Sequence, residues 1–337
     1  MNVSVIVITH NNSSIIKECL KSIISQLSDK DQLIILDNGS MDGTYELLQE
    51  NSDIDILIRE EINIGISKGR NKAANFAKNE YLFFVDADMI VHNGSIDSLK
   101  KCTSDIVIGI YYNTGEGLVW YRETKSKYLS GKDSVCFSPV TLNNFYTMSG
   151  GFSAIKYELF MELNGFDSFF DNATMEDIDF EIRALNKNKT VSITSSISGT
   201  HCKNELNKKK FLLWCISCGK GNARLFFKSH NTKIQLPKTK YYPRYPFFSI
   251  VNFIGLIGSL VLVILNPCFG IAGIIFSLSL FYFHYIDLFK FLKNKKNILT
   301  KHKVMFLLSL DDILTNLSLT IELVRLYIKR RGISNDG

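Results

Sequence analysis

Two aspartates, Asp86 and Asp88, follow the short apolar run at residues 81–85. A short β-rich run without polar residues predicts a strand that is buried on both faces. Such a strand ends at the carboxyl edge of a parallel sheet, where open α/β sheets bind ligands. Two nearby carboxylates repel each other unless a cation lies beside them, and a divalent metal that bridges to phosphate is the simplest such cation. The competing interpretation is an Asp-rich turn at a strand end.

The residues before this run alternate between strand and helix patterns. Strands are predicted at residues 3–8, 32–36 and 54–58. Helices are predicted at residues 14–26, from residue 42 onward, and through Ala77 after the 63–71 segment. This alternation predicts a parallel sheet with right-handed crossovers. Polar clusters follow two of the strands, at residues 9–11 and 37–40. Taken singly, Asp37 could be a turn residue and Arg70 a solvated helix charge.

A second group of candidate residues follows residue 147. The pair Gly150–Gly151 permits close approach of the backbone to a ligand, although a β-bulge would also explain it. Acids crowd a predicted helix start at Glu176, Asp177, Asp179 and Glu181. The helix dipole favours acids there, and Asp179 and Glu181 are interpreted in this way. His201 follows a predicted Gly-Thr turn, and a lone histidine is more often structural than a ligand. Residues 111–147 show no clean period and are interpreted as pocket-shaping loops, with one strand at 117–121.

Four segments together resemble the family 2 glycosyltransferases. They are Val-Ile-Val-Ile-Thr-His-Asn-Asn at 5–12, Leu-Asp-Asn-Gly-Ser-Met-Asp-Gly-Thr at 36–44, Asn-Ile-Gly-Ile-Ser-Lys-Gly-Arg-Asn at 63–71 and Val-Asp-Ala-Asp at 85–88. Their order and spacing match over residues 3 to 92, with a weaker continuation to about residue 228. The resemblance implies an α/β nucleotide-diphospho-sugar transferase (GT-A) fold, a mostly parallel sheet between helices, and metal-dependent inverting transfer. Many members have Pro-Thr-Tyr or similar where Thr9-His10 stands here.

The resemblance also implies roles for single residues. Asp37 would accept a hydrogen bond from the nucleotide base, and Arg70 would lie near the base and phosphates. Asp86 would lie near the ribose and the metal, Asp88 would ligate the metal, and His201 would complete the shell of a Mn²⁺ or Mg²⁺ ion. The residues expected to bind the nucleotide sugar are Thr9, Asn11, Asp37, Asn63, Gly65, Arg70, Asn71, Asp86, Ala87, Gly150 and Gly151.

The acid pair Glu176-Asp177 matches the Glu-Asp pair of the family, which follows a Gly-Phe-Asp segment as it does here. Sugar transfer needs a base that takes the proton of the acceptor hydroxyl. Asp177 is therefore assigned as the catalytic base, with Glu176 as its neighbour or alternate.

The segment after residue 230 differs in composition. Residues 231–246 form a basic, Pro-containing linker after a 1–230 catalytic domain. The uncharged runs at 247–265 and 268–286 are each long enough to span a bilayer, and a helical hairpin is predicted over 247–288. Flanking basic residues place both ends in the cytoplasm. A buried hairpin in a soluble protein is the alternative.

Residues 289–337 are predicted to contain a basic segment and an amphipathic helix. Its apolar stripe consists of Phe306, Leu310, Ile313, Leu317, Ile321, Val324 and Ile328. This helix would lie on the membrane surface, or bind a second copy or a glycan-assembly partner.

Composition bounds the remaining function classes. The 337 residues carry a net charge of +6, which suits nucleotide diphosphates or acidic lipid headgroups. Seven scattered cysteines argue against a disulfide scaffold, and no signal peptide opens the chain, so a cytoplasmic catalytic part is expected at the cytoplasmic membrane. The expected acceptor is a lipid-linked or cell-surface glycan, and no nucleic-acid partner is expected. The alternatives are a polyprenyl-phosphate sugar synthase and a non-catalytic scaffold of a glycan-assembly complex.

Overall fold

The structure is a computed structural model, in which the chain forms two compact units. The first contains residues 1–120, 133–206 and 228–237, and the second contains residues 121–132, 207–227 and 238–337. The structure describes residues 1–114, 137–142, 148–171, 174–202, 208–232, 234–236, 255, 258–284, 314–315 and 317–329. The strand predicted at 117–121 and the linker after residue 236 lie outside these residues.

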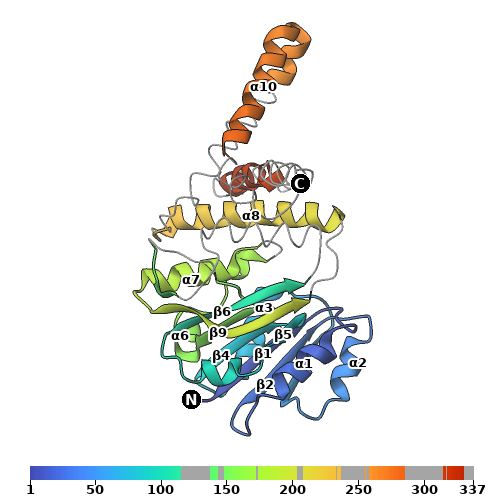
Figure 1. Cartoon of the computed structure of the whole chain (residues 1–337), viewed down its shortest axis with the longest axis vertical. Helices are drawn as coiled ribbons and strands as arrows, with labels where there is room; N and C mark the ends of the chain where they lie inside the picture. Colours follow the sequence, from blue (N-terminus) through green and yellow to red (C-terminus); the bar gives the residue numbers. More distant parts are fainter. Residues whose placement is uncertain are drawn as a thin grey trace. The chain divides into compact units, whose positions relative to one another are not determined.

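The first unit is built on a nine-stranded sheet (Figure 1). The strands are β1 (Val3–Thr9), β2 (Gln32–Asn38), β3 (Ile56–Glu60), β4 (Tyr81–Asp86), β5 (Met89–Val91), β6 (Ile106–Thr114), β7 (Phe137–Val140), β8 (Phe152–Lys156) and β9 (Val191–Cys202). Their order is β3-β2-β1-β4-β8-β6-β9-β5, and β7 pairs with β9. This is the α/β architecture that the sequence predicted.

The sheet is mixed, which corrects the prediction of a mostly parallel sheet. Strands β3, β2, β1 and β4 run parallel, as the strand–helix alternation indicated. Strand β8 is antiparallel to both β4 and β6, and β5 and β7 are antiparallel to β9. The alternation holds only in the first half of the chain, so it could not predict the direction of the later strands.

Helices cover both faces of the sheet. Their bounds are α1 (Ile16–Ile24), α2 (Thr44–Gln49), α3 (Ile66–Ala74), α4 (Ser95–Leu99), α6 (Tyr157–Glu162) and α7 (Glu176–Asn186), with a 3₁₀ turn η1 (Ser168–Phe170). Side chains of α1, α2 and α4 join one core cluster, and side chains of α3, α6 and α7 join the other. Alternate residues of β1 enter opposite clusters, with Val5 in the first and Ile6 in the second. This two-sided burial explains why the strands are apolar without interruption.

Two local features create the site. Strand β4 ends at Asp86 and β5 starts at Met89, so Asp88 lies in the short turn between the two strands. His201 lies inside β9, paired with Met89, and not after a turn. The β9 strand continues through Gly199 and Thr200 because both are held in register with β5 and β6. The backbone N–H of Cys202 also donates to the Asp88 carbonyl at 2.8 Å, which brings His201 to the aspartate turn.

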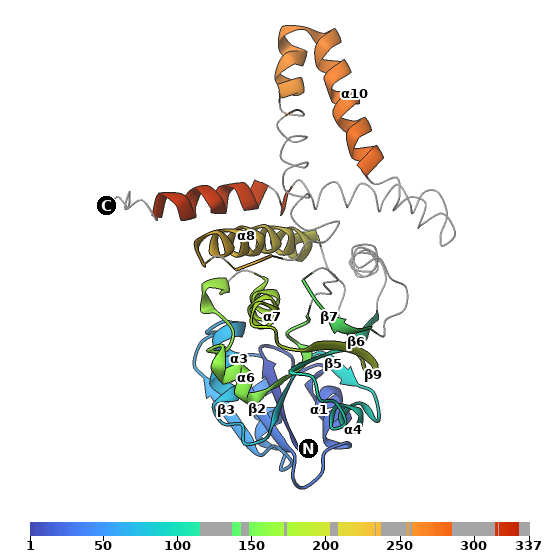
Figure 2. The ribbon, with the colours of Figure 1, turned by 90° about the vertical axis from the view of Figure 1, so that its left-hand side faces the viewer.

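The second unit contains most of α8 (Lys208–Thr232), a helical pair that includes α10 (Pro267–His284), and a helix at 317–329 (Figure 2). Residues 258–265 are helical, and the chain reverses at Asn266. A Cβ on Gly273 would lie 2.4 Å from the Ser259 hydroxyl, so the two helices touch through this glycine. In the described parts of the chain, no helix combines the length and the apolar character needed to cross a membrane. Most of the first predicted span, 247–257, lies outside them.

Candidate active site

Three side chains at the edge of the sheet can hold one cation. Atoms of Asp86, Asp88 and His201 that could act as ligands all lie within 4.8 Å of one another. The His201 Nε2 atom is 2.8 Å from Asp88 Oδ1, and its ring packs edge-on against Tyr111. His201 is buried, whereas the two aspartate side chains are 38% and 29% exposed, so the cluster opens toward solvent. Two carboxylates and an imidazole fit a manganese or magnesium ion.

Arg70 connects this cluster to the acid pair at the start of α7. It is buried, and its Nη2 atom lies 3.0 Å from Asp86 Oδ1 while Nη1 lies 3.1 Å from Glu176 Oε1. Its guanidinium also lies over the Phe166 ring, 5.5 Å from the centroid. Breaking a buried ion pair of this kind typically costs about 3–5 kcal/mol. Arg70 therefore fixes the distance between the metal-capable cluster and the candidate base.

The glycine pair lies against these charged groups. A Cβ at Gly150 would lie 2.4 Å from Arg70 Nη1, and a Cβ at Gly151 would lie 2.0 Å from the Asp86 carboxyl carbon. The Gly151 carbonyl accepts from the Asp86 backbone N–H at 2.8 Å. The close approach that the sequence predicted is therefore directed at the side chains of the site.

We expect Gly151→Ala to displace the Asp86 carboxylate, since the new methyl group and that carboxylate cannot occupy the same space. Overpacking typically costs about 1–3 kcal/mol in stability, and metal-dependent nucleotide binding should weaken further. Calorimetry and thermal unfolding of the same preparation measure both effects. Gly258→Ala is the control, because no atom of the described residues lies within 4 Å of a Cβ placed there. Unchanged nucleotide binding in Gly151→Ala would contradict this arrangement.

Glu176 and Asp177 stand at the first residues of α7, after Met175 in a left-handed conformation with φ 88°. Burial, together with the neighbouring Asp177 charge, raises the pKa of Glu176 to about 7 although Arg70 opposes the shift. Burial also raises the pKa of Asp177, against hydrogen bonds from backbone N–H groups. One of those bonds runs from Gly150 to Asp177 Oδ2 at 2.9 Å. Burial therefore shifts both carboxyl groups toward the protonated form, and the Glu176 pKa of about 7 lies in the range that general acids and bases use.

Glu181 lies beyond the first turn of α7, so the interpretation as a helix-start acid does not explain its position. It is fully buried, and its Oε2 atom accepts from the Met148 backbone N–H at 2.8 Å. Its Oε1 atom finds no hydrogen-bond partner in the residues that the structure describes. Burial raises the pKa of Glu181 well above its ordinary value. Together, Glu181 and Asp177 therefore bind the backbone of residues 148–150 to α7 through hydrogen bonds.

This raised pKa predicts a specific pH dependence of stability. The folded chain keeps the Glu181 proton where the unfolded chain releases it, so the free energy of unfolding falls as pH rises above the ordinary pKa of a glutamate. The slope from this one group is at most about 1.4 kcal/mol per pH unit. Glu181→Gln removes it, so the variant should gain stability relative to the parent between pH 5 and about pH 7. Thermal unfolding measured across this pH range tests the prediction, with Glu158→Gln as the control at an exposed position. The prediction is wrong if stability changes with pH in the same way in Glu181→Gln and in Glu158→Gln.

The nucleotide-binding candidates at β1 and β2 meet at the same sheet edge. Thr9 pairs with Asp37 in the strand register, and Ile8 pairs with Asp86. Asp37 is fully buried; its Oδ2 atom accepts from the Ser40 N–H at 3.3 Å, and its Oδ1 atom has no partner among the described residues. Asn11, at φ 56°, accepts from the Met41 N–H and donates its own N–H to Ser40 Oγ. The buried Asp37 oxygen is an acceptor suited to a base N–H group.

The remaining predicted contacts shape the loops around α3. The Asn63 side chain accepts from the Gly65 N–H at 2.9 Å, and Gly65 precedes α3 with φ 92°. The Asn71 amide is engaged at both atoms with the Phe166 backbone, at 2.7 and 2.9 Å. Ala87 is buried between the two aspartates. Direct contact of Asn63, Gly65, Asn71 and Ala87 with a nucleotide sugar stays a prediction.

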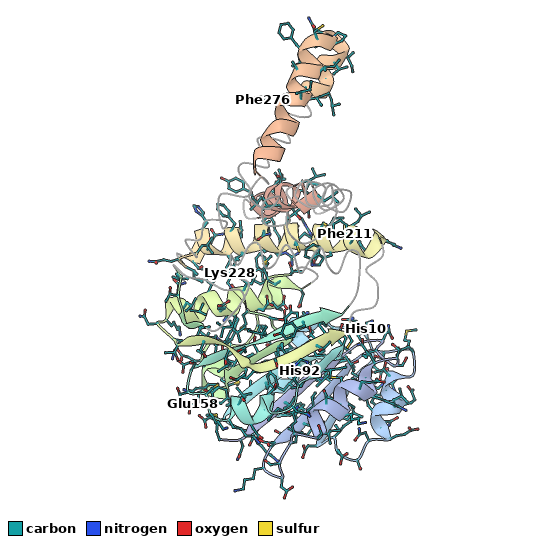
Figure 3. All side chains as sticks on the ribbon, viewed as in Figure 1. His10, His92, Glu158, Phe211, Lys228 and Phe276 are labelled. Carbon is teal, nitrogen blue, oxygen red and sulfur yellow. The ribbon has the colours of Figure 1, made fainter. Side chains whose placement is uncertain are left out.

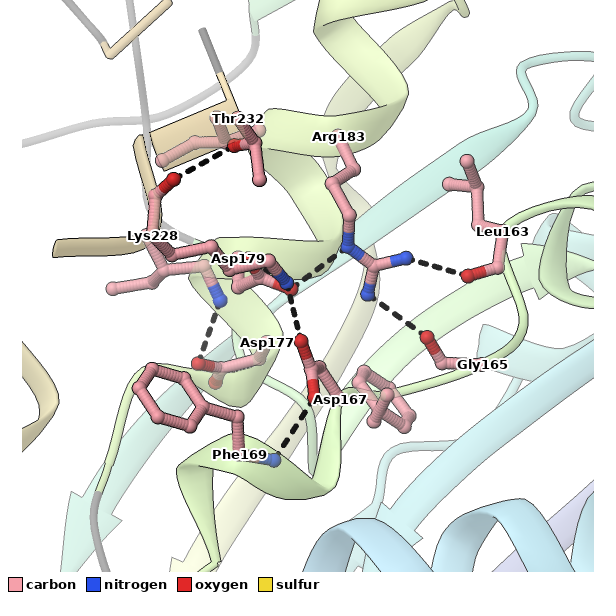
Figure 4. A network of polar contacts seen from close by, with 12 residues as sticks. Leu163, Gly165, Asp167, Phe169, Asp177, Asp179, Arg183, Lys228 and Thr232 are labelled. Carbon is pink, nitrogen blue, oxygen red and sulfur yellow. Dashed lines mark hydrogen bonds and ion pairs between the residues drawn. The ribbon is translucent and has the colours of Figure 1, made fainter. Parts of the chain in front are cut away.

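A buried ion network behind α7 was missed by the sequence interpretation (Figure 4). Asp179, taken there as a helix-start acid, pairs with Arg183 Nε at 2.7 Å and with Lys228 Nζ at 2.8 Å. Lys228 also binds Asp167, and Arg183 donates to the Leu163 and Gly165 carbonyls. Asp179 and Arg183 are four residues apart on one helix, and this spacing indicates an ion pair between them. Lys228 gave no such signal, because its partners lie far away in the sequence.

The mixed sheet with acids at its edge defines a GT-A-type fold, and solved structures share it. The chain aligns with residues 1–349 of S. aureus TarS in complex with UDP-GlcNAc at TM-score 0.51 and 21% identity, over 69% of this chain and 73% of that one. It aligns with the mannosyltransferase PcManGT from Pyrobaculum calidifontis, in complex with GDP-Man and Mn²⁺, at TM-score 0.55 and 15% identity, over 96% of this chain and 86% of that one. At these identities the likeness shows the fold alone.

Sequence comparison supplies the family. Residues 4–163 match the model of glycosyl transferase family 2, so this part of the chain belongs to that family, as its motifs predicted. The glycosyltransferase GlyG of Streptococcus pneumoniae is 28% identical over 198 residues, which are 51% of this chain and 63% of GlyG. The chain spans less than two thirds of GlyG and 18% of a second pneumococcal relative, GlyA, which is 32% identical over 36% of this chain.

Proposed function

We propose that this chain is an inverting glycosyltransferase that takes a sugar from a nucleoside diphosphate sugar. The observation that carries this proposal is the convergence of Asp86, Asp88 and His201 within 4.8 Å at the sheet edge that also presents the buried Asp37. Asp86, Asp88 and His201 would hold a Mn²⁺ or Mg²⁺ ion. A bound ion would neutralise the diphosphate and stabilise it as a leaving group.

The chain's own residues would then orient the donor and take the proton. Arg70, placed between Asp86 and Glu176, keeps positive charge beside the phosphate end of the site. Asp177 would accept the proton of the acceptor hydroxyl, and its pKa, raised by burial, makes it a stronger base than an ordinary aspartate. Glu176 is the alternate base. Inversion would follow from a single attack on the face opposite the leaving diphosphate.

We further propose a lipid-linked or cell-surface glycan acceptor at the cytoplasmic face of the membrane. The support comes from residues 260–276, where large apolar side chains are exposed; Figure 3 labels one of them, Phe276. Ile264 is 83% exposed and Leu265 is 76% exposed, which is costly for a surface in water. The same observation suits the second candidate, a polyprenyl-phosphate sugar synthase, because its acceptor is itself a membrane lipid.

Hydrolysis of a panel of nucleotide sugars tests the proposed activity. The full chain should release nucleoside diphosphate from at least one donor when Mn²⁺ or Mg²⁺ is present, and chelation should stop the release. Addition of polyprenyl phosphate then separates the two acceptors, because only the synthase would transfer sugar to it. Failure to hydrolyse any donor, with the metal bound, would contradict the proposed function.

A further inference from the structure

The helix at residues 317–329 carries its apolar stripe on the outside. Leu317, Ile321, Val324 and Ile328 recur at helical spacing, and each is 41–61% exposed. On the other side of the helix, Ser318, Leu319 and Glu322 are buried. An amphipathic helix of a water-soluble protein buries its apolar side and exposes its polar side, because burying apolar area stabilises the fold by about 25 cal/mol per Å². The exposed stripe therefore needs an apolar environment outside the chain.

Polar contacts hold the buried side of this helix against α8. Figure 2 shows the ribbons of the two helices next to each other. A Cβ on Gly219 of α8 would lie 2.2 Å from the Thr315 carbonyl oxygen, so the two backbones approach closely there. Ser318 Oγ donates to the Ile216 carbonyl at 2.8 Å. Arg224 Nε lies 2.9 Å from Glu322 Oε1, and both side chains are largely buried. Small residues, hydroxyl bonds and a buried ion pair thus fix which side of the helix faces outward.

The α8 helix adds to the exposed apolar surface of the same unit. Its large apolar side chains that are at least a third exposed are Leu212 at 40%, Leu213 at 56%, Ile216 at 36% and Phe226 at 53%. With the stripe on 317–329 and the exposed Tyr327, two adjacent helices present nine large apolar side chains to the outside. Large apolar side chains exposed in this number on two adjacent helices indicate an interaction surface.

Among the described residues, the exposed charged side chains of these two helices are all basic. Helix α8 contains several lysines and no Asp or Glu. The one acid within 317–329 is Glu322, and it is buried against Arg224. Arg325 is 72% exposed beside the apolar stripe, and Lys209 and Lys329 are exposed as well. An apolar face flanked by cations alone is complementary to a bilayer surface that contains anionic lipids.

We propose that α8 and residues 317–329 form one membrane-binding surface that lies on an anionic bilayer. The stripe Leu317, Ile321, Val324 and Ile328 would enter the headgroup–acyl boundary, and Arg325 and Lys329 would contact lipid phosphates. This inference rests on the proposed membrane acceptor and extends it, because it assigns the lipid contact to α8 and not to the C-terminal helix alone.

Fluorescence quenching by brominated lipids tests the inference on the full chain. A tryptophan is placed at Val324 after Trp120→Phe and Trp214→Phe, and the chain is reconstituted in vesicles of phosphatidylcholine and phosphatidylglycerol in equal parts, with bromine on the acyl chains. The brominated acyl chains should quench the tryptophan fluorescence of Val324→Trp, and its emission maximum should move to shorter wavelength. The control is Phe76→Trp in the same background, an exposed position of the first unit, which should show neither change. In the double variant Arg325→Gln/Lys329→Gln, the difference in quenching between these vesicles and vesicles of pure phosphatidylcholine should become smaller.

Two results would overturn the inference. If iodide in the aqueous phase quenches the fluorescence of Val324→Trp and brominated lipid does not, the stripe stays in water. Val324→Trp protected from both quenchers would show that protein covers it, either a second copy or a partner. Hydrolysis of a nucleotide sugar, measured on the same vesicles, reports the proposed activity separately, so loss of quenching with retained hydrolysis contradicts the membrane surface alone.

Discussion

Asp177→Asn should lower the transfer rate by about 10²–10⁴-fold, the usual contribution of a general base. The substitution keeps the size of the side chain, and the amide oxygen can still accept from the Gly150 N–H. Donor affinity should stay near that of the parent, because the metal-capable residues lie on β4, β9 and the turn after β4. Donor affinity and transfer rate measured on one preparation separate the two effects.

Glu176→Gln is the matched control for this assignment. Glu176 lies next to Asp177 and pairs with Arg70, so its loss should change donor positioning as well as rate. Retained transfer in Asp177→Asn together with loss in Glu176→Gln would move the base one residue back. Retained transfer in both variants would place the base elsewhere and leave this helix start as a charged cap.

Asp88→Asn should abolish metal-dependent nucleotide binding. Loss of a residue that only supports a metal ligand costs about 10–100-fold in metal affinity, and loss of a carboxylate ligand should cost at least as much. Asp86→Asn should have the smaller effect, because we assign that side chain mainly to the ribose and to Arg70. Calorimetric titration of nucleoside diphosphate with and without Mn²⁺ measures the difference.

The control for Asp88→Asn is Asp97→Asn. Asp97 is 73% exposed, and its one ion-pair contact is at 4.0 Å, so nucleotide binding should not change. Unchanged Mn²⁺-dependent binding in Asp88→Asn would show that the turn after β4 does not hold the ion.

Most of the first half of the fold could be predicted from the sequence. Strands β1, β2 and β4 are buried on both faces, and such strands carry uninterrupted apolar runs that are easy to recognise. Asp37 and Asp86 come at the ends of those runs, so their meeting at one edge followed from a parallel sheet. The glycine pair at 150–151 also indicated a close backbone approach, although its neighbours Arg70 and Asp86 could not be predicted from local sequence.

The second half depended on contacts between distant residues. His201 reaches Asp88 because β9 extends over twelve residues beside β5 and β6, and its polar Ser/Thr-rich sequence does not show that length. Likewise, Asp179 and Glu181 resemble ordinary helix-start acids, and only their burial against Lys228 and the Met148 backbone shows otherwise. Burial of a charged residue is set by tertiary packing, which the local pattern does not contain.

The most direct test of the central claim is pulsed electron paramagnetic resonance of Mn²⁺ bound with a nucleoside diphosphate. If Asp86, Asp88 and His201 hold the ion together, the spectrum should show coupling to an imidazole nitrogen, and His201→Gln should remove it. Manganese bound together with nucleotide but surrounded by oxygen ligands alone in the parent chain would contradict the claim.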